Sequence, residues 1–197
     1  MLLRDSVFAR LPELSTQRLL LRKMTMADAQ DIYDYSSDPE VSRHVLWEAH
    51  RTIHDSRAYL RYILRQYRNG EPSSWGIVLS QTNRLIGTIG YMWWNQENHS
   101  AEVGYSLARS QWNHGIMTEA LWAVLRFGFE EMRLHRIEAQ HEVDNPASGR
   151  VMEKCGMRRE GVLRGRLYNK GRYVDVALYA ILVEEWRAIA RSEGRFR

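Results

Sequence analysis

The segment from Trp112 to Ala120, WNHGIMTEA, is the stretch of this sequence best suited to binding a charged ligand. It lies between a predicted strand that ends at Leu107 and a predicted helix that begins near Thr118. The N–H groups in the first turn of a helix have no partner within the helix, and they carry the positive end of its dipole. Gly115 lacks a Cβ, so an anion can approach the backbone closely. This arrangement favours a diphosphate as the ligand.

A single glycine before a helix is also common in turns that bind nothing, so this segment alone does not identify a ligand. Two familiar nucleotide sites are excluded. The sequence has no Gly-x-Gly-x-x-Gly after a strand, the pattern of dinucleotide-binding folds. It also has no Gly-Lys-Ser/Thr loop of the kind that holds a magnesium nucleotide.

The elements before this turn are predicted to be two amphipathic helices and a set of strands. One helix is expected over 25–35, with Thr25 as its N-cap and Asp28 at the N3 position. The other is expected over 52–67 and ends at Asn69-Gly70. Strands are predicted over 18–23, 74–79, 85–93 and 101–107. Since short polar turns join the last three strands, these should pair antiparallel.

After the turn, the pattern becomes helix, strand, helix and a final pair of strands. Helices are expected over 118–132, over 146–154 and from Glu184, with strands over 136–143, 158–167 and 173–182. Hairpins followed by a strand–helix–strand–helix unit favour an α/β (α+β) fold, with a mixed, mostly antiparallel sheet and helices on both faces. We expect a single domain over 1–197, with its core at about 14–190.

The composition is that of an ordinary globular protein: 44% of the 197 residues are apolar and 26% are charged. One cysteine excludes an intramolecular disulfide, and no apolar run approaches the ~20 residues of a membrane-spanning helix. With no signal peptide recognised, a cytoplasmic protein is expected. The formal net charge is +4, and the basic residues are scattered along the sequence except for a cluster at Arg158, Arg159, Arg164 and Arg166. No aromatic-basic pattern predicts direct reading of a nucleic acid.

The order of short motifs along the chain resembles the GCN-five-related N-acetyltransferases, and in particular their RimJ/RimL-like branch. The matching segments are LSTQRLLLR at 14–22, Asp28-Ala29, Asp38-Pro39, Gly104-Tyr105, TEA at 118–120, NPAS at 145–148, EKCGM at 153–157, Glu160-Gly161 and Leu163-Arg164. The superfamily's loop pattern, Gln/Arg-x-x-Gly-x-Gly/Ala, falls on 112–117, where Trp112 and Met117 depart from it. The matches run through nearly the whole chain in order.

This resemblance implies acetyl-CoA as the co-substrate, with no metal. Backbone near Ser106 and Leu107 would pair with the pantetheine, in a gap where this strand splays from the strand after the helix. A one-residue bulge is a common cause of such a splay, and Gly104 is a candidate position for it, with a packing glycine as the alternative. Asn145 would cap the next helix and contact the cofactor. The remaining cofactor-binding residues implied at the turn are Asn113, His114, Gly115, Ile116, Met117 and Thr118.

The chemistry requires an acceptor amine that has lost its proton and a leaving thiolate that gains one. Glu102 is the candidate base, acting through water. Ser148 lies three residues after Asn145, as in the family's Asn-x-x-Ser, and is the candidate proton donor or sulfur ligand as well as a cofactor contact. Direct attack by the amine needs no protein nucleophile, so Cys155 is expected to be a buried structural thiol.

Some residues depart from a related branch. RimI-like enzymes carry a glutamate base and a tyrosine acid at the positions of Gln140 and Met152, so that acid–base pair does not transfer to this chain. Tyr105 and His141 are the fallback candidates. Four aromatic residues are candidates for shaping the acceptor pocket, although core packing is the default for such side chains: Tyr35, Trp47, Trp93 and Trp94.

Three functions remain open on the sequence. The first is acetylation of a protein N-terminal α-amine, as in ribosomal-protein acetyltransferases. The second is acetylation of a small amine such as an aminoglycoside, a polyamine or a toxin. The third is a non-catalytic CoA-binding sensor or interaction module, against which the presence of Glu102 and Ser148 argues. A homodimer is possible, and no membrane partner is expected.

Overall fold

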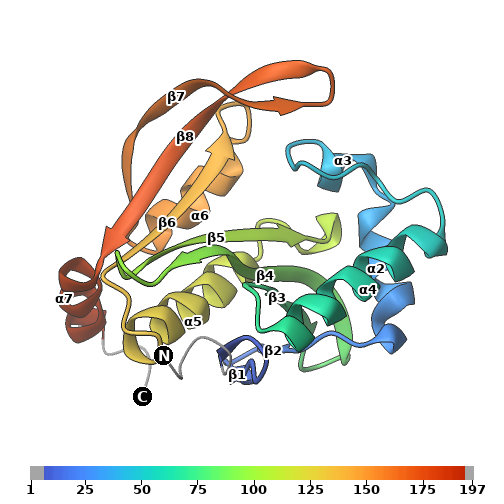
Figure 1. Ribbon diagram of the computed structural model, residues 1–197, viewed down its shortest axis with the longest axis horizontal. Coiled ribbons are helices and arrows are strands. Elements are labelled where there is room, and N and C mark those ends of the chain that lie inside the picture. The colour runs from blue at the N-terminus through green and yellow to red at the C-terminus, as the bar shows by residue number, and fades with distance from the viewer. Residues whose placement is uncertain (1–6, 194–197) are drawn as a thin grey trace.

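The computed structural model describes residues 7–193 and contains one eight-stranded sheet in the order β1-β2-β3-β4-β5-β6-β8-β7 (Figure 1). Among residues 7–193, only β5 and β6 pair in parallel, and all other neighbouring strands are antiparallel. The strands are β1 (Leu14–Ser15), β2 (Leu19–Arg22), β3 (Ser74–Leu79), β4 (Arg84–Asn95), β5 (Ser100–Leu107), β6 (Arg136–Glu142), β7 (Arg158–Asn169) and β8 (Arg172–Leu182). The expected mixed, mostly antiparallel sheet is confirmed.

Helices cover both faces of the central strands. Tyr91 of β4 donates a hydrogen bond of 2.9 Å to the carbonyl of Val124 in one helix. Thr88, which points to the opposite face, lies beside Tyr35 and Tyr59 of two other helices. The helices are α2 (Ala29–Ser36), α3 (Pro39–Ser42), α4 (Ile53–Asn69), α5 (Ile116–Glu130), α6 (Pro146–Lys154) and α7 (Val183–Glu193), with 3-10 turns η1 (Met26–Asp28) and η2 (Arg109–Gln111).

Helix boundaries follow the capping residues. Thr25 and Asp28 form a capping box at η1, so the helix predicted from Thr25 begins as a 3-10 turn and becomes regular at Ala29. Gly70 ends α4 in the left-handed conformation. The helix predicted from Thr118 begins at Ile116, two residues earlier, because the chain enters it directly from Gly115 at a φ of 73°.

The parallel strands β5 and β6 separate soon after they meet. Their pairing joins 100–102 to 136–138 and goes no further, so β5 continues alone on that side from Val103 onward. The expected splay is therefore present. The expected bulge at Gly104 is wrong: Gly104 pairs regularly with Gly90, and the extra residue lies on β4 at Met92, between Tyr91 and Trp93. The neighbouring strand absorbs the irregularity, with the Met92 side chain beside Gly104.

The strands β7 and β8 form a long hairpin that extends toward α3 (Figure 1). They run further than predicted, to Asn169 and from Arg172, because Lys170 and Gly171 make a two-residue turn with φ angles of 48° and 83°. No helix among residues 7–193 is long and apolar enough to cross a membrane.

Candidate active site

The 112–120 turn presents backbone amides that have no partner in the protein. In the part of the chain that the structure describes, nothing accepts a hydrogen bond from the amides of Gly115, Ile116, Met117 or Thr118. The turn is exposed from Asn113 to Gly115, and α5 becomes buried at Ile116 and Met117. Asn113 and Gly115 both have left-handed backbones, which direct the chain abruptly into the helix. This geometry fits an anion bound at the N-terminus of α5.

Trp112 has a structural role that explains its departure from the superfamily's loop pattern. Its indole N–H donates a 2.9 Å hydrogen bond to the carbonyl of Leu107 at the end of β5. The turn is therefore tied back to the strand that precedes it. Ser106, one residue earlier, shares a 3.1 Å hydrogen bond with Thr88 through its side chain. Any ligand pairing with Leu107 through its carbonyl would share it with this indole.

Glu102 is held at the point where β5 and β6 separate. Its carboxylate accepts hydrogen bonds from the Trp93 indole at 2.7 Å and from the Gln140 amide at 3.0 Å. Burial raises the pKa of Glu102 above the usual carboxyl value, and those two hydrogen bonds offset part of the effect. A half-buried carboxylate of raised pKa at the end of a strand pair is suited to accept a proton.

Ser148 lies on the other side of the sheet from Glu102, next to Tyr105. The Ser148 hydroxyl and the Tyr105 hydroxyl are 2.9 Å apart, and the Tyr105 hydroxyl lies 3.0 Å from the Ser148 carbonyl. Positions 102 and 105 of a regular strand point to opposite faces, so Tyr105 faces α6 while Glu102 faces away from it. Burial raises the pKa of Tyr105, which keeps its hydroxyl protonated at neutral pH.

Three other candidates lie where their roles can be judged. Asn145 occupies the N-cap position of α6, as expected, although its side chain makes no capping hydrogen bond. His141 packs beneath α6 against Gly149 and Tyr179, with its Nδ1 bound at 2.7 Å to the carbonyl of Glu142. Cys155 is fully buried, as expected of a structural thiol.

Three of the aromatic candidates lie on or against the sheet, whereas Trp47 lies in the loop after α3, beside His50. Trp93 orients Glu102, and Tyr35 is buried beside Ser106. Trp94 packs edge-on against Phe8, with ring centroids 5.7 Å apart, so its side chain belongs to the hydrophobic core and not to the acceptor face. Strand alternation gives the reason, because adjacent residues of β4 cannot face the same side.

No sequence pattern indicates the contact between the tip of the β7–β8 hairpin and the loop after α3, which we call the hairpin–loop contact. It consists of 42–47, Glu142 and 169–172. The Lys170 ammonium donates to the carbonyls of Ser42, Val45 and Trp47 at 2.9, 2.7 and 3.1 Å. Nearby, Glu142 is almost fully buried and accepts hydrogen bonds from three side chains: His44, Asn169 and Arg172.

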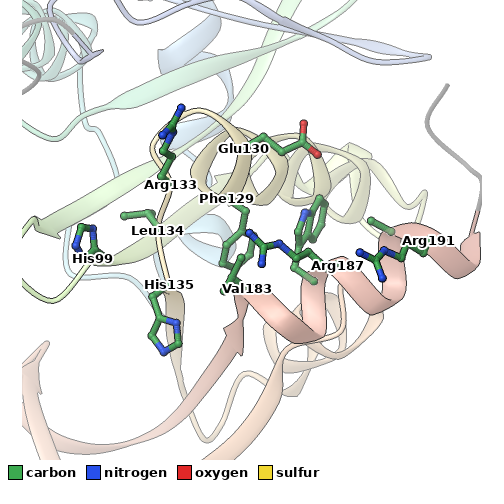
Figure 2. A pocket seen from close by; sticks show the side chains of 11 residues that line it. His99, Phe129, Glu130, Arg133, Leu134, His135, Val183, Arg187 and Arg191 are labelled. Carbon is green, nitrogen blue, oxygen red and sulfur yellow. The ribbon is translucent and has the colours of Figure 1, made fainter.

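A separate hollow of about 840 Å³ lies at the other end of the sheet, between α5 and α7 (Figure 2). Its lining includes His99, His135 and Arg187, and none of the candidate site residues. Figure 2 shows the side chains of Arg133 and His135 pointing away from one another. This hollow is therefore distinct from the site at the β5–β6 splay.

Comparison with known proteins decides the family. The family model described as an acetyltransferase (GNAT) domain matches residues 18–158, well over half of the chain. The chain belongs to the GNAT acetyltransferase family. It is thus an N-acetyltransferase, of the RimJ/RimL-like kind, and enzymes of this family use acetyl-CoA.

Individual relatives of this GNAT acetyltransferase agree. An uncharacterized N-acetyltransferase of Bacillus licheniformis, p20, is 34% identical over 88% of this chain and 97% of its own length. The ribosomal protein uS5-alanine N-acetyltransferase of Escherichia coli is 27% identical over 88% of this chain and 92% of its own. A GNAT-family acetyltransferase of Bacillus anthracis has the same fold, with a TM-score of 0.79, 32% identity, and coverage of 88% of this chain and 99% of that one.

Proposed function

We propose that this protein transfers the acetyl group of acetyl-CoA directly to a protein N-terminal α-amine. The observation that carries the reaction is the placement of Glu102 and Ser148 on opposite faces of the sheet at the β5–β6 splay. An amine can then approach from the Glu102 face while the thioester lies on the Ser148 face. We call these two faces the acceptor side and the donor side.

On the donor side, the open amides of the 112–120 turn fit the diphosphate of acetyl-CoA. Asn113, His114, Gly115, Ile116, Met117 and Thr118 would form this part of the site, mainly through the backbone. Ser106 and Leu107 would border the pantetheine where β5 no longer pairs with β6, and Asn145 would lie beside it at the start of α6.

The proton movements follow from the contacts on each face. Glu102 would accept the proton of the acceptor amine through water at one of its carboxylate oxygens, which still have lone pairs after binding Trp93 and Gln140. Ser148 would give its hydroxyl proton to the departing sulfur and take in its place the second proton that the amine nitrogen loses as the amide forms. Tyr105 would position the Ser148 hydroxyl and keep its own proton. No covalent bond to the protein is needed.

The choice of acceptor rests on the relatives. One whose acceptor is stated, the uS5-alanine enzyme, matches most of both chains and modifies a ribosomal protein. An N-terminal peptide is therefore the first acceptor to test, with a ribosomal protein as its source.

The experiment is a panel of acceptors at saturating acetyl-CoA. Peptides with a free α-amine are compared with the same peptides bearing a blocked N-terminus and an internal lysine, and with aminoglycosides and polyamines. We expect the highest kcat/KM for the free N-terminal peptides. Turnover of small amines alone, or of blocked peptides equally well, would overturn the proposed acceptor but not the acetyl donor.

A further inference from the structure

Glu119 places a negative charge in the first turn of α5, where the donor's diphosphate is proposed to bind. Burial raises the pKa of Glu119, but hydrogen bonds from Thr16 and Arg18 outweigh it and hold that pKa below the usual value. The side chain is therefore ionised at neutral pH. A carboxylate at a helix N-terminus occupies the same positive potential that attracts a phosphate, so an uncompensated Glu119 would repel the ligand.

Arg18, just before β2, compensates this charge and also contacts the turn itself. Its Nε donates to the Glu119 carboxylate at 2.6 Å, and its backbone N–H donates to the same carboxylate at 2.8 Å. Its Nη1 donates to the carbonyl of His114 at 2.9 Å. The other terminal nitrogen, Nη2, lies 3.6 Å from the position that a Cβ on Gly115 would occupy. The guanidinium thus lies directly against the turn.

We propose that Arg18 is a positioning residue that sets the affinity for the diphosphate of the acetyl donor. It neutralises Glu119 and holds the His114 carbonyl, so that the free amides from Gly115 to Thr118 face an anion without a competing charge. This inference rests on the proposed binding of acetyl-CoA at the 112–120 turn. It adds to that site a residue almost a hundred positions earlier in the chain.

The test is a charge-compensation cycle read by the Kd of acetyl-CoA at low ionic strength. Arg18→Met should weaken binding at least about tenfold. Adding Glu119→Gln to it should restore most of the affinity, because the exposed negative charge is gone. Glu119→Gln alone should bind acetyl-CoA as tightly as the wild type or more tightly, and this arm remains informative if Arg18→Met folds poorly.

Two controls separate positioning from damage to the fold. Arg84→Met removes another half-exposed arginine, paired with Asp31 and Asp34 away from the turn, and should leave the Kd unchanged. S-acetyl-pantetheine lacks the diphosphate, so Arg18→Met should leave its KM unchanged.

Any one of four results would overturn the inference. Arg18→Met could leave the Kd of acetyl-CoA unchanged, or could weaken the use of S-acetyl-pantetheine to the same extent. The double variant could fail to recover affinity, or Glu119→Gln alone could bind acetyl-CoA more weakly than the wild type. If wild-type protein did not bind acetyl-CoA at all, the proposed function would fail instead. The two failures are therefore distinguishable.

Discussion

The proposed donor side takes most of its binding groups from one stretch of nine residues, 112–120, which leads from the turn after β5 into α5. The hairpin–loop contact, which we propose borders the acceptor side, is instead made by Lys170 binding carbonyls that lie 123 to 128 residues earlier in the sequence. Local sequence determines the first arrangement, whereas the second exists only after the sheet has formed. The difference explains why the donor is easier to identify than the acceptor.

A similar contrast applies to the two groups that we propose move protons, Glu102 and Ser148. Glu102 is oriented by side chains from the strands on either side of it, β4 and β6. Ser148 is oriented by Tyr105 of β5, a residue that the sequence indicated only as a fallback candidate. Predictions that separate the two sides therefore test whether each group acts where the structure places it.

The largest effect is expected at Glu102. Glu102→Gln removes the proposed base and should lower kcat/KM for the peptide by about 10²-fold, within the range for general-base catalysis. The matched control is Glu138→Gln, which changes a carboxylate at the paired position on β6 and should retain most activity. Steady-state kinetics measure both, and equal losses would remove Glu102 from its role.

The pH dependence sharpens the same point. A base must be ionised, so activity falls as the pH drops through the pKa of Glu102, which burial places above the usual carboxyl value. The wild-type kcat/KM profile should therefore show an acidic limb that Glu102→Gln lacks. A limb that is the same in both proteins would assign it to another group, such as the acceptor amine.

The next effect is expected on the donor side. Ser148→Ala should lower kcat at least about tenfold, which corresponds to ~1.4 kcal/mol of activation free energy, with little change in the Kd of acetyl-CoA. Ser80→Ala changes an exposed serine after β3 and serves as the control. Turnover that is unchanged in Ser148→Ala would leave Tyr105 as the better candidate for the proton donor.

A smaller effect, on the KM of the acceptor peptide alone, is expected at Lys170. Lys170→Met removes the ammonium that three carbonyls bind, and loosening of the hairpin–loop contact should raise the peptide KM about fivefold, or ~1 kcal/mol. The Kd of acetyl-CoA should stay within about twofold. Arg164→Met, on the same hairpin and without an ion pair among residues 7–193, is the control. A change in acetyl-CoA binding alone would contradict the division into two sides.

The smallest effect is expected at Gly115, and it should affect only the donor. Gly115→Ala forces a Cβ into a left-handed backbone, which costs about 1–2 kcal/mol, and should weaken acetyl-CoA binding a few-fold. Gly165→Ala introduces comparable strain at a φ of 57° in open space on β7. It should lower stability to a similar extent without changing the Kd. Equal losses of affinity in both variants would point to general destabilisation.

The sequence predicted the order of elements well, because hydrophobic periodicity and capping residues act locally. It placed the start of α5 within two residues, and the family resemblance implied the splay of β5 from β6 without its position. Its candidate position for a bulge was Gly104 and not Met92, whereas the structure supports the alternative of a packing glycine, because a Cβ on Gly104 would meet the Met92 side chain. Trp94 packs against the core, which was the default for such side chains, whereas the extra residue at Met92 turns Trp93 to the Glu102 face.

Contacts between distant segments were beyond the reach of sequence patterns. Lys170 lies in an ordinary Asn-Lys-Gly turn, and nothing near it indicates that its ammonium will bind the loop after α3. The burial of Glu142 likewise depends on His44 and Arg172 arriving from two other elements. Arg18 belongs to a recognisable motif, but its contact with the 112–120 turn depends on how β2 packs against α5.

The central claim, that the 112–120 turn and the β5–β6 splay hold acetyl-CoA, is tested most directly by thermal unfolding with and without that ligand. A ligand that binds only the native state stabilises it by about 2.7 kcal/mol at a hundred times its Kd, which for a chain of this size raises Tm by roughly 5–10 °C. We predict that shift for acetyl-CoA and a smaller one for S-acetyl-pantetheine. No shift at saturating acetyl-CoA would contradict the account.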